Sequence, residues 1–168
     1  DFGLCRWADT LVEAAVVCAL LGAAATQDSG AFRGTWGQHP AGRDRRMQSV
    51  AIVGASNDRA KYGNKAVRAH RAHGIVVYPV HPRETQVEGL TAYSSVLDIP
   101  GPVERVILYV PPAVGLQVIE EVARKGVKEL WVSPGADSPE LLERAEALGL
   151  HPVVACSIIA IGEKPSEF

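Results

Sequence analysis

Apolar and polar positions follow two alternating periods from Ser49 onward. Short apolar runs typical of buried parallel strands occur at Ser49–Val53, Ile75–Val80, Arg105–Val110, Lys128–Val132 and Pro152–Cys156. Between them, helical spacing predicts helices over Lys61–His73, before Gly126, and between Ser138 and Gly149. This alternation predicts an α/β, Rossmann-like, doubly wound fold with a mainly parallel five-stranded sheet and helices on both faces.

Local signals refine three of these elements. Ser138, Pro139 and Glu140 have the order of an N-cap residue, a first-position proline and a first-turn acid. The long connection over residues 83–104 is expected to contain a short helical turn near Ser95. His70 and His73 lie toward a helix end with no third metal ligand in view, so both are interpreted as surface histidines.

Residues 1–46 differ from the remainder of the chain. They contain no lysine, and residues 11–25 form a nearly continuous apolar run. Its length suits a secretory signal and is short of a bilayer span, but Asp1, Asp9 and Glu13 beside it argue against a signal. The only methionine, Met47, directly precedes the first strand. We therefore predict an extension over residues 1–46 and one domain over residues 47–168.

Composition excludes several classes of protein. The formal net charge is −2 and 47% of residues are hydrophobic, which suits one buried core and provides no basic surface for nucleic acid. The three cysteines have no metal-ligand spacing and leave one over from any pair. A reduced, cytoplasmic protein without a membrane partner or metal is the simplest interpretation.

A glycine turn follows the first strand and points to a phosphate. Gly54 allows a tight turn and a close approach of ligand to backbone, and Gly63 stands where the next helix meets the sheet. Backbone N–H groups and the positive end of that helix would then face an anion. Gly54→Val is accordingly expected to leave the protein folded and to abolish nucleotide binding.

The end of the second strand narrows the choice of nucleotide. A NAD site normally has an acid there for the ribose hydroxyls, whereas this strand ends in Val80, His81, Pro82 and Arg83. A basic residue suits an additional phosphate, which NADP and coenzyme A both carry. The residues alone leave these two ligands open.

Four motifs together resemble a known family. The segments are Val50–Ser56, Tyr78–Pro82, Val110–Pro112 and Ala155–Cys156. They are similar to small stand-alone CoA-binding proteins and to the N-terminal domain of the succinyl-CoA synthetase alpha subunit and of NDP-forming acyl-CoA synthetases. The resemblance covers about Ser49 to Gly162 and implies a Rossmann-like domain that binds CoA or an acyl-CoA.

The strand ends and the resemblance together give a candidate ligand-binding set. It comprises Gly54, Ala55, Ser56, Asn57, Arg59, Lys61, Gly63, Val80, His81, Pro82, Arg83, Val110, Pro111, Pro112, Ser133, Pro134 and Gly135. The resemblance implies that Gly54, Ser56 and Asn57 line the pyrophosphate turn. It also implies that Lys61 and Arg83 contact phosphates and that Val110–Pro112 flank the adenine. His81 stands where the family usually has Asn.

No catalytic constellation accompanies this set. His81 is interpreted as a turn residue or ligand contact rather than an acid–base catalyst. Cys156 is interpreted as a small hydrophobe rather than as a thiol that forms a mixed disulfide with CoA. Ser56 and Ser133 lack a partnering His–Asp pair for serine hydrolysis.

Three functions remain open. The first is a non-catalytic, cytoplasmic CoA-binding or acyl-CoA-binding protein, which the residues favour. The second is an NADP-dependent oxidoreductase or a redox-sensing nucleotide-binding domain. The third is a detached subunit of an acyl-CoA ligase that works with an ATP-grasp partner chain. A homodimer is compatible with each of them.

Overall fold

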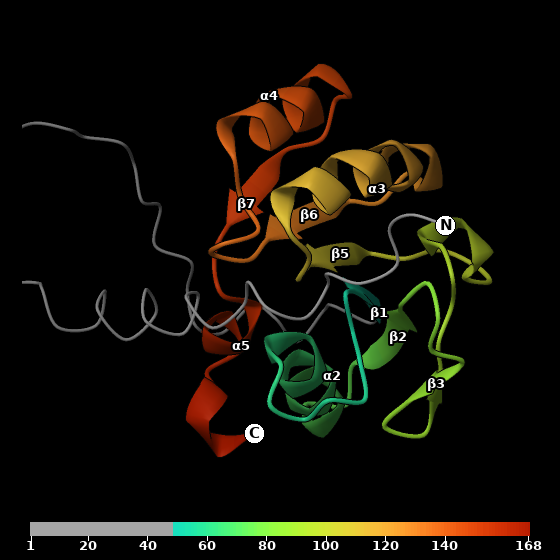
Figure 1. Ribbon diagram of the computed structural model, residues 1–168, viewed down its shortest axis with the longest axis vertical. Helices are drawn as coiled ribbons and strands as arrows, with labels where there is room; N and C mark the ends of the chain where they lie inside the picture. The colour runs from blue at the N-terminus through green and yellow to red at the C-terminus, as the bar shows by residue number, and fades with distance from the viewer. Residues whose placement is uncertain (1–48) are drawn as a thin grey trace, which may run out of the picture.

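The computed structural model describes residues 49–168, which form a domain around one parallel sheet (Figure 1). Its strands lie in the order β2 (Val76–Val80), β1 (Ser49–Val53), β5 (Arg105–Leu108), β6 (Glu129–Val132) and β7 (Pro152–Val154). Every neighbouring pair is parallel. The chain order reverses between β1 and β5, where a doubly wound sheet opens a crevice for ligand. The predicted fold class is confirmed.

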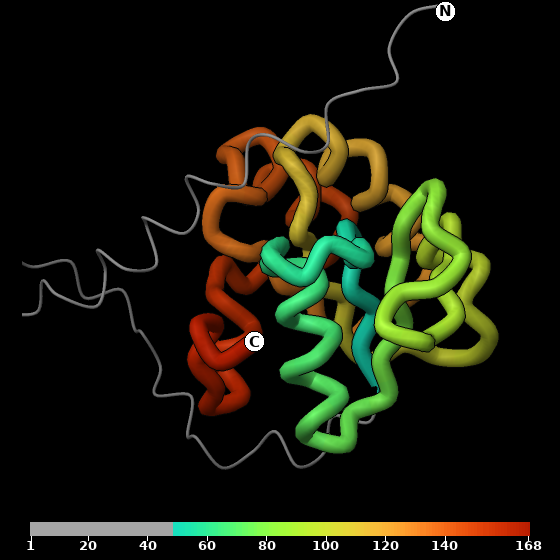
Figure 2. Tube along the Cα trace, turned by 60° about the horizontal axis from the view of Figure 1, so that its bottom comes forward, coloured from blue at the N-terminus to red at the C-terminus, as the bar shows by residue number. Residues whose placement is uncertain are grey.

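Helices cover both faces of the sheet, as Figures 1 and 2 show. They are α2 (Tyr62–Ala72), α3 (Pro112–Lys125), α4 (Pro139–Ala147) and α5 (Ser157–Ala160). Alternate residues of β1 point to opposite faces. Val50 and Ile52 belong to the apolar core that α2 and α5 cover, whereas Ala51 and Val53 belong to the core beneath α3 and α4. Burial on both faces explains why the strands are continuously apolar.

The connection between β2 and β5 contains a hairpin that the apolar pattern did not predict. Its strands are β3 (Gln86–Val87) and β4 (Leu90–Thr91). Glu88 and Gly89 between them both have positive φ, 49° and 77°, as the tightest hairpin turns require. The predicted helical turn near Ser95 is confirmed as η2 (Val96–Asp98), which Ser95 caps by accepting from the Leu97 N–H.

Two strands end earlier than predicted, and β2 and β6 each begin one residue later. β5 ends at Leu108 rather than Val110, and β7 ends at Val154 rather than Cys156. In each case one more N–H continues the ladder, from Tyr109 to the Val53 carbonyl and from Ala155 to the Val132 carbonyl. The chain then turns into α3 and α5, so the last apolar residues serve as connections.

Of the two histidines predicted to lie on the surface near the end of α2, His73 does so but His70 does not. His70 is fully buried, and its Nδ1 lies 2.8 Å from the Ala66 carbonyl oxygen. His70 shares the apolar face of α2 with Val67. Its position on that face therefore buries it, although its imidazole is polar. His73 is exposed as predicted and pairs with Glu163 at 2.6 Å.

The predicted extension over residues 1–46, its apolar run and the predicted start at Met47 lie outside the described residues. Between residues 49 and 168, no helix has both the length and the apolar character that a membrane span requires. The described chain ends in a 3₁₀ turn, η3 (Pro165–Glu167), whose Pro165 carbonyl accepts from Lys65 on α2.

Candidate functional site

The predicted ligand-binding residues lie at the carboxyl ends of β1, β2, β5 and β6, in the connections that follow these strands, and in the first turns of α2 and α3. Hydrogen bonds join these connections to one another. The Gly54 N–H donates to the Val80 carbonyl at 3.0 Å, and the Ser133 N–H donates to the Leu108 carbonyl at 3.2 Å. The four segments thus lie along one edge of the sheet, on both sides of the reversal in strand order.

Position 54 has to be glycine because the residues that follow β5 pack directly against it. Its φ is +89°, and a Cβ atom there would lie 2.3 Å from the Tyr109 carbonyl oxygen and 2.9 Å from Val110 Cγ1. The expectation that Gly54→Val leaves the fold intact is therefore wrong. The space behind Gly54 is filled by backbone of this chain, and the turn itself depends on the glycine.

Gly63 allows α2 to pack against the same turn. A Cβ atom on Gly63 would lie 2.4 Å from the Gly54 carbonyl oxygen. The first turn of α2 therefore touches the backbone that leaves β1, as predicted from the glycine spacing. The two glycines bring the amino end of α2 directly onto the site.

The backbone of residues 55–57 carries three successive donors without acceptors. Within the described part of the chain, no acceptor pairs with the N–H groups of Ala55, Ser56 and Asn57. The rest of the loop is satisfied internally, because the Asp58 N–H donates to Ser56 Oγ and the Ala60 N–H to Asp58 Oδ1. Unpaired backbone N–H groups next to a helix N-terminus are the donors that bind anions in other phosphate sites.

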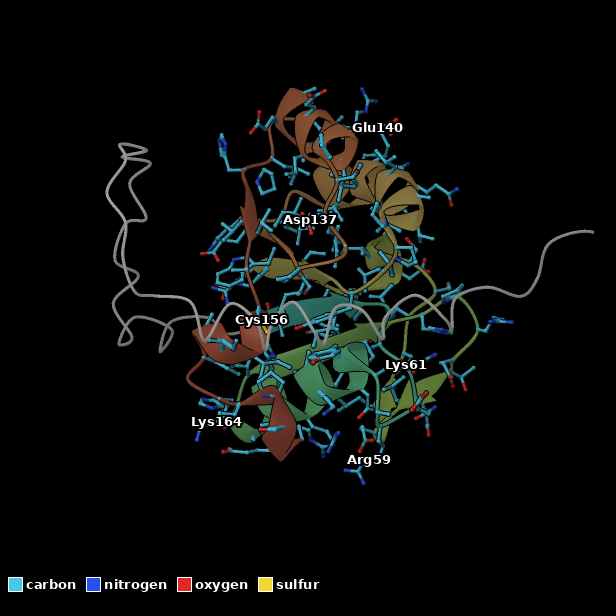
Figure 3. The ribbon with its side chains drawn as sticks, turned by 60° about the vertical axis from the view of Figure 1, so that its left-hand side comes forward. Arg59, Lys61, Asp137, Glu140, Cys156 and Lys164 are labelled. Carbon is cyan, nitrogen blue, oxygen red and sulfur yellow. The ribbon has the colours of Figure 1, made fainter. Side chains whose placement is uncertain are left out.

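The amino end of α2 lacks the usual capping side chain. Its N-cap residue is Lys61, which makes no side-chain cap hydrogen bond, and no acid occurs in the first turn. The helix dipole therefore adds positive potential beside the free N–H groups. Figure 3 shows Arg59 and Lys61 close to this end of α2. The Arg59 side chain is 66% exposed and pairs weakly with Glu88 at 3.4 Å.

His81 closes the turn after β2. Its Nδ1 accepts from the N–H groups of Arg83 at 3.2 Å and Glu84 at 3.1 Å. Burial lowers the pKa of the His81 side chain. The positive charges of Arg83 and Lys61 lower it further, whereas the negative charge of Glu84 raises it. The neutral ring is thus favoured, which is the state that accepts at Nδ1. These bonds fit the interpretation of His81 as a turn residue.

The ends of β5 and β6 differ in what they leave open. Val110 is buried and Pro111 is the N-cap of α3, which has no capping side chain and no first-turn acid. After β6, the Gly135 N–H donates to Asp137 Oδ1 at 2.8 Å, so that donor is already occupied. Ser133 is 4% exposed, and its hydroxyl has no partner among the described residues.

Asn64 was missed by the sequence analysis, although it lies among the candidate residues. It is fully buried on α2 and donates to the Ser56 carbonyl at 2.7 Å and to Glu88 at 3.1 Å. Its place beside Gly63 and three residues before Val67 put it on the apolar helix face, where an amide needs partners. A polar amide on the apolar face of the predicted helix is the feature of the sequence that could have identified Asn64.

Cys156 follows β7 at the end of the sheet. Cys156 is partly exposed, immediately precedes α5 and packs against the apolar core under α2. Between residues 49 and 168, no three His, Cys, Asp or Glu side chains lie close enough together to hold a metal ion.

Comparison with known proteins identifies relatives of this region. Residues 48–162 match the family described as CoA binding domain. The chain is 42% identical over 82 residues to the alpha subunit of an ADP-forming acetate–CoA ligase II of Pyrococcus furiosus, a match that covers 48% of this chain and 18% of the relative. A second such ligase, from Archaeoglobus fulgidus, is 37% identical over 101 residues, covering 59% of this chain and 15% of the relative. The matches thus span less than a fifth of these ligases.

Solved structures of two sizes share the fold. A conserved hypothetical protein from Pyrococcus furiosus aligns with a TM-score of 0.63 and 38% identity, over 68% of this chain and 98% of its own. A dinucleotide-forming acetyl-coenzyme A synthetase of Ca. Korarchaeum cryptofilum aligns with a TM-score of 0.57 and 30% identity, over 63% of this chain and 25% of its own. The same domain thus occurs in a small protein and within a larger synthetase.

Proposed function

Because this chain belongs to the family of CoA-binding domains, we propose that it is a non-catalytic protein that binds CoA or an acyl-CoA in the cytoplasm. The ligand lies at the carboxyl ends of the strands, with its pyrophosphate on the turn from Gly54 to Ser56. The observation that supports this proposal is the run of three N–H groups at Ala55–Asn57 that have no acceptor among residues 49–168, beside an α2 whose N-cap side chain makes no cap hydrogen bond. Such a run is complementary to a pyrophosphate.

The charges around the turn favour a ligand with several phosphates. Lys61 is partly exposed at the start of α2, and Arg59 and Arg83 are exposed on the adjoining connections. No acid ends β2 to hold the free ribose diol of NAD. The 3′-phosphate of CoA would instead find a cation, with Arg83 as the candidate.

The experiment is isothermal titration of the full chain with CoA, acetyl-CoA, NAD and NADP in parallel. We expect CoA to bind with a micromolar or lower Kd, and NAD and NADP to bind at least about tenfold more weakly. Binding of NADP alone would overturn the proposal in favour of a redox domain. A comparison of CoA with acetyl-CoA then reports whether the acyl group contributes.

A second candidate function is favoured by the relatives named above. Two of them are ADP-forming CoA ligases, of which one is an alpha subunit. On this alternative the chain is a detached ligase subunit that delivers CoA to a separate ATP-grasp chain. The full chain would then convert acetate, CoA and ATP to acetyl-CoA, ADP and phosphate only when such a chain is added. Unchanged acetyl-CoA levels with the added chain would exclude this role.

A further inference from the structure

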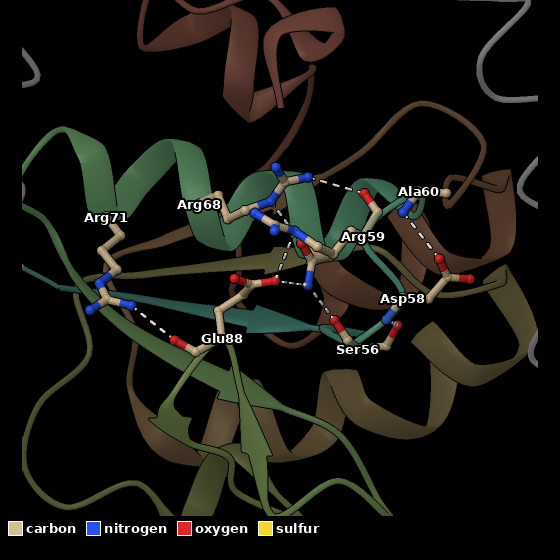
Figure 4. Close-up of polar contacts among 8 residues, drawn as sticks. Ser56, Asp58, Arg59, Ala60, Arg68, Arg71 and Glu88 are labelled. Carbon is tan, nitrogen blue, oxygen red and sulfur yellow. Dashed lines mark hydrogen bonds and ion pairs between the residues drawn. The ribbon is translucent and has the colours of Figure 1, made fainter.

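The loop from Ser56 to Arg59 is held by α2 and by the β3–β4 hairpin (Figure 4). Asn64 Nδ2 donates to the Ser56 carbonyl at 2.7 Å, and Arg68 donates to the Arg59 carbonyl at 3.0 Å. From the other side, Asn57 Nδ2 donates to Glu84 at 2.7 Å and to the Gln86 carbonyl at 2.8 Å. Three of the four loop residues are thus tied to neighbouring elements.

Asn64 is the centre of this network. Its two amide hydrogens go to the Ser56 carbonyl and to Glu88 Oε1, while its Oδ1 accepts from Arg68 Nε at 2.9 Å. The side chain is fully buried, so water does not substitute for these partners. Asn64 and Arg68 are four residues apart and therefore share one face of α2.

The bond to Ser56 fixes the direction of a proposed ligand donor. The C=O and N–H of a trans peptide point in opposite directions. When Asn64 holds the Ser56 carbonyl toward α2, the Asn57 N–H points away from Asn64 and has no acceptor among the described residues. The same contact therefore sets the orientation of one of the three open donors.

We propose that Asn64 is a positioning residue that presents the Asn57 N–H to an anionic phosphate of the ligand, with Glu88 anchoring Asn64 from the hairpin. The inference rests on the proposed CoA function and adds a specific residue to it. Asn64 is buried and acts through the backbone of the loop. A preoriented donor binds an anion without first having to reorganise the peptide.

The first test is titration of Asn64→Leu with CoA. Leucine has nearly the shape of asparagine but donates nothing, so the Ser56–Asn57 peptide is no longer held. We expect the Kd for CoA to rise by about tenfold or more. Glu163→Gln, which alters the pair with His73 at the far end of α2, is the matched control and should leave the Kd unchanged.

A second pair of variants separates positioning from stability. Asn64→Asp places a carboxylate beside Glu88 and should lower the melting temperature. Adding Glu88→Gln restores a donor–acceptor pair between these two side chains, but the Ser56 carbonyl still lacks its donor. We expect the melting temperature to recover while the Kd stays about tenfold weaker than that of Glu88→Gln alone. Recovery of both would overturn the inference and leave Asn64 a purely structural role.

The outcomes distinguish this inference from the proposed function. Failure of the unmodified chain to bind CoA would contradict the proposed function. Binding by the unmodified chain and equally tight binding by a folded Asn64→Leu would contradict only the role of Asn64. If Asn64→Leu does not fold, the comparison of the double variant, Asn64→Asp with Glu88→Gln, against Glu88→Gln alone decides the question by itself.

Discussion

The amino ends of α2 and α4 follow the carboxyl ends of two strands in the same sheet, yet they are built differently. Ser138 caps α4 by accepting from the Leu141 N–H at 3.2 Å, and Glu140 stands in its first turn. The first turn of α2 has neither a capping side chain nor an acid. Figure 3 shows the acidic pair Asp137 and Glu140 at α4 and the basic pair Arg59 and Lys61 at α2.

The difference shows which helix end is complete by itself. A capping oxygen and an external anion use the same N–H groups, so a capped end has less to offer a phosphate. The turn before α4 is closed by Asp137, whereas the N–H groups of residues 55–57 before α2 have no acceptor in the described part of the chain. We interpret α4 as optimised for stability and α2 as completed by the ligand.

Removing the turn before α2 should have the largest effect. Gly54→Val drives a Cβ into the Tyr109 carbonyl and forces a β-branched residue to φ +89°. We expect a loss of about 3 kcal/mol or more in the free energy of unfolding, measured by urea denaturation. Gly74→Ala also has positive φ but open space, so about 1 kcal/mol is expected there. Equal losses would contradict the steric account.

Giving α2 the chemistry of α4 should abolish the difference between them. Lys61→Asp introduces a capping carboxylate where the helix has none and removes a cation from the proposed phosphate site. We expect the Kd for CoA to rise by about tenfold or more, while stability stays level or increases by up to about 1 kcal/mol. Titration and thermal unfolding of the same sample measure both. Unchanged affinity would remove α2 from the site.

The converse change concerns α4. Ser138→Ala deletes the acceptor for the Leu141 N–H, and we expect a loss of about 1 kcal/mol in stability. Because α4 is not assigned a ligand donor, the Kd for CoA should remain the same. A weaker Kd in a stably folded Ser138→Ala protein would show that α4 also contributes to binding.

The smallest expected effect is a pH dependence from His81. Its pKa is lowered from the ordinary 6.5 by burial, with Arg83 and Lys61 acting in the same direction and Glu84 against them. The fold therefore favours neutral His81. Stability should be full above the ordinary pKa, fall as pH drops toward the lowered value, and level off below it. Thermal unfolding between about pH 7.5 and about pH 5 measures this. Asparagine keeps an acceptor without titrating, so His81→Asn should lose this part of the dependence; an identical profile would contradict it.

The sequence predicted the repeating parts of this structure better than its tertiary contacts. Buried parallel strands and amphipathic helices leave periodic signals, and the Ser138 cap leaves a local one. The β3–β4 hairpin has two-residue strands and a Glu88–Gly89 turn in which only the glycine signals positive φ. The two acceptors of the Asn64 amide lie 8 and 24 residues away, and no local pattern specifies such pairs.

Gly54 shows the same limit at the site. Its spacing indicated that a side chain is unwelcome there, but the sequence did not show what the side chain would meet. The answer, the Tyr109 carbonyl, comes from the pairing of β1 with β5, two strands that lie far apart in the chain. The sequence was therefore sufficient to identify Gly54 as a candidate position. The reason why glycine is needed there became clear only from the order of the strands in the sheet.

The most direct test is to follow backbone amide resonances by ¹⁵N–¹H NMR while CoA is added to the full chain. We expect the largest shifts at Ala55, Ser56 and Asn57, with little change at Leu141, whose N–H is already bonded to Ser138. Saturable CoA binding that leaves residues 55–57 unmoved would contradict the assignment of the pyrophosphate to this turn.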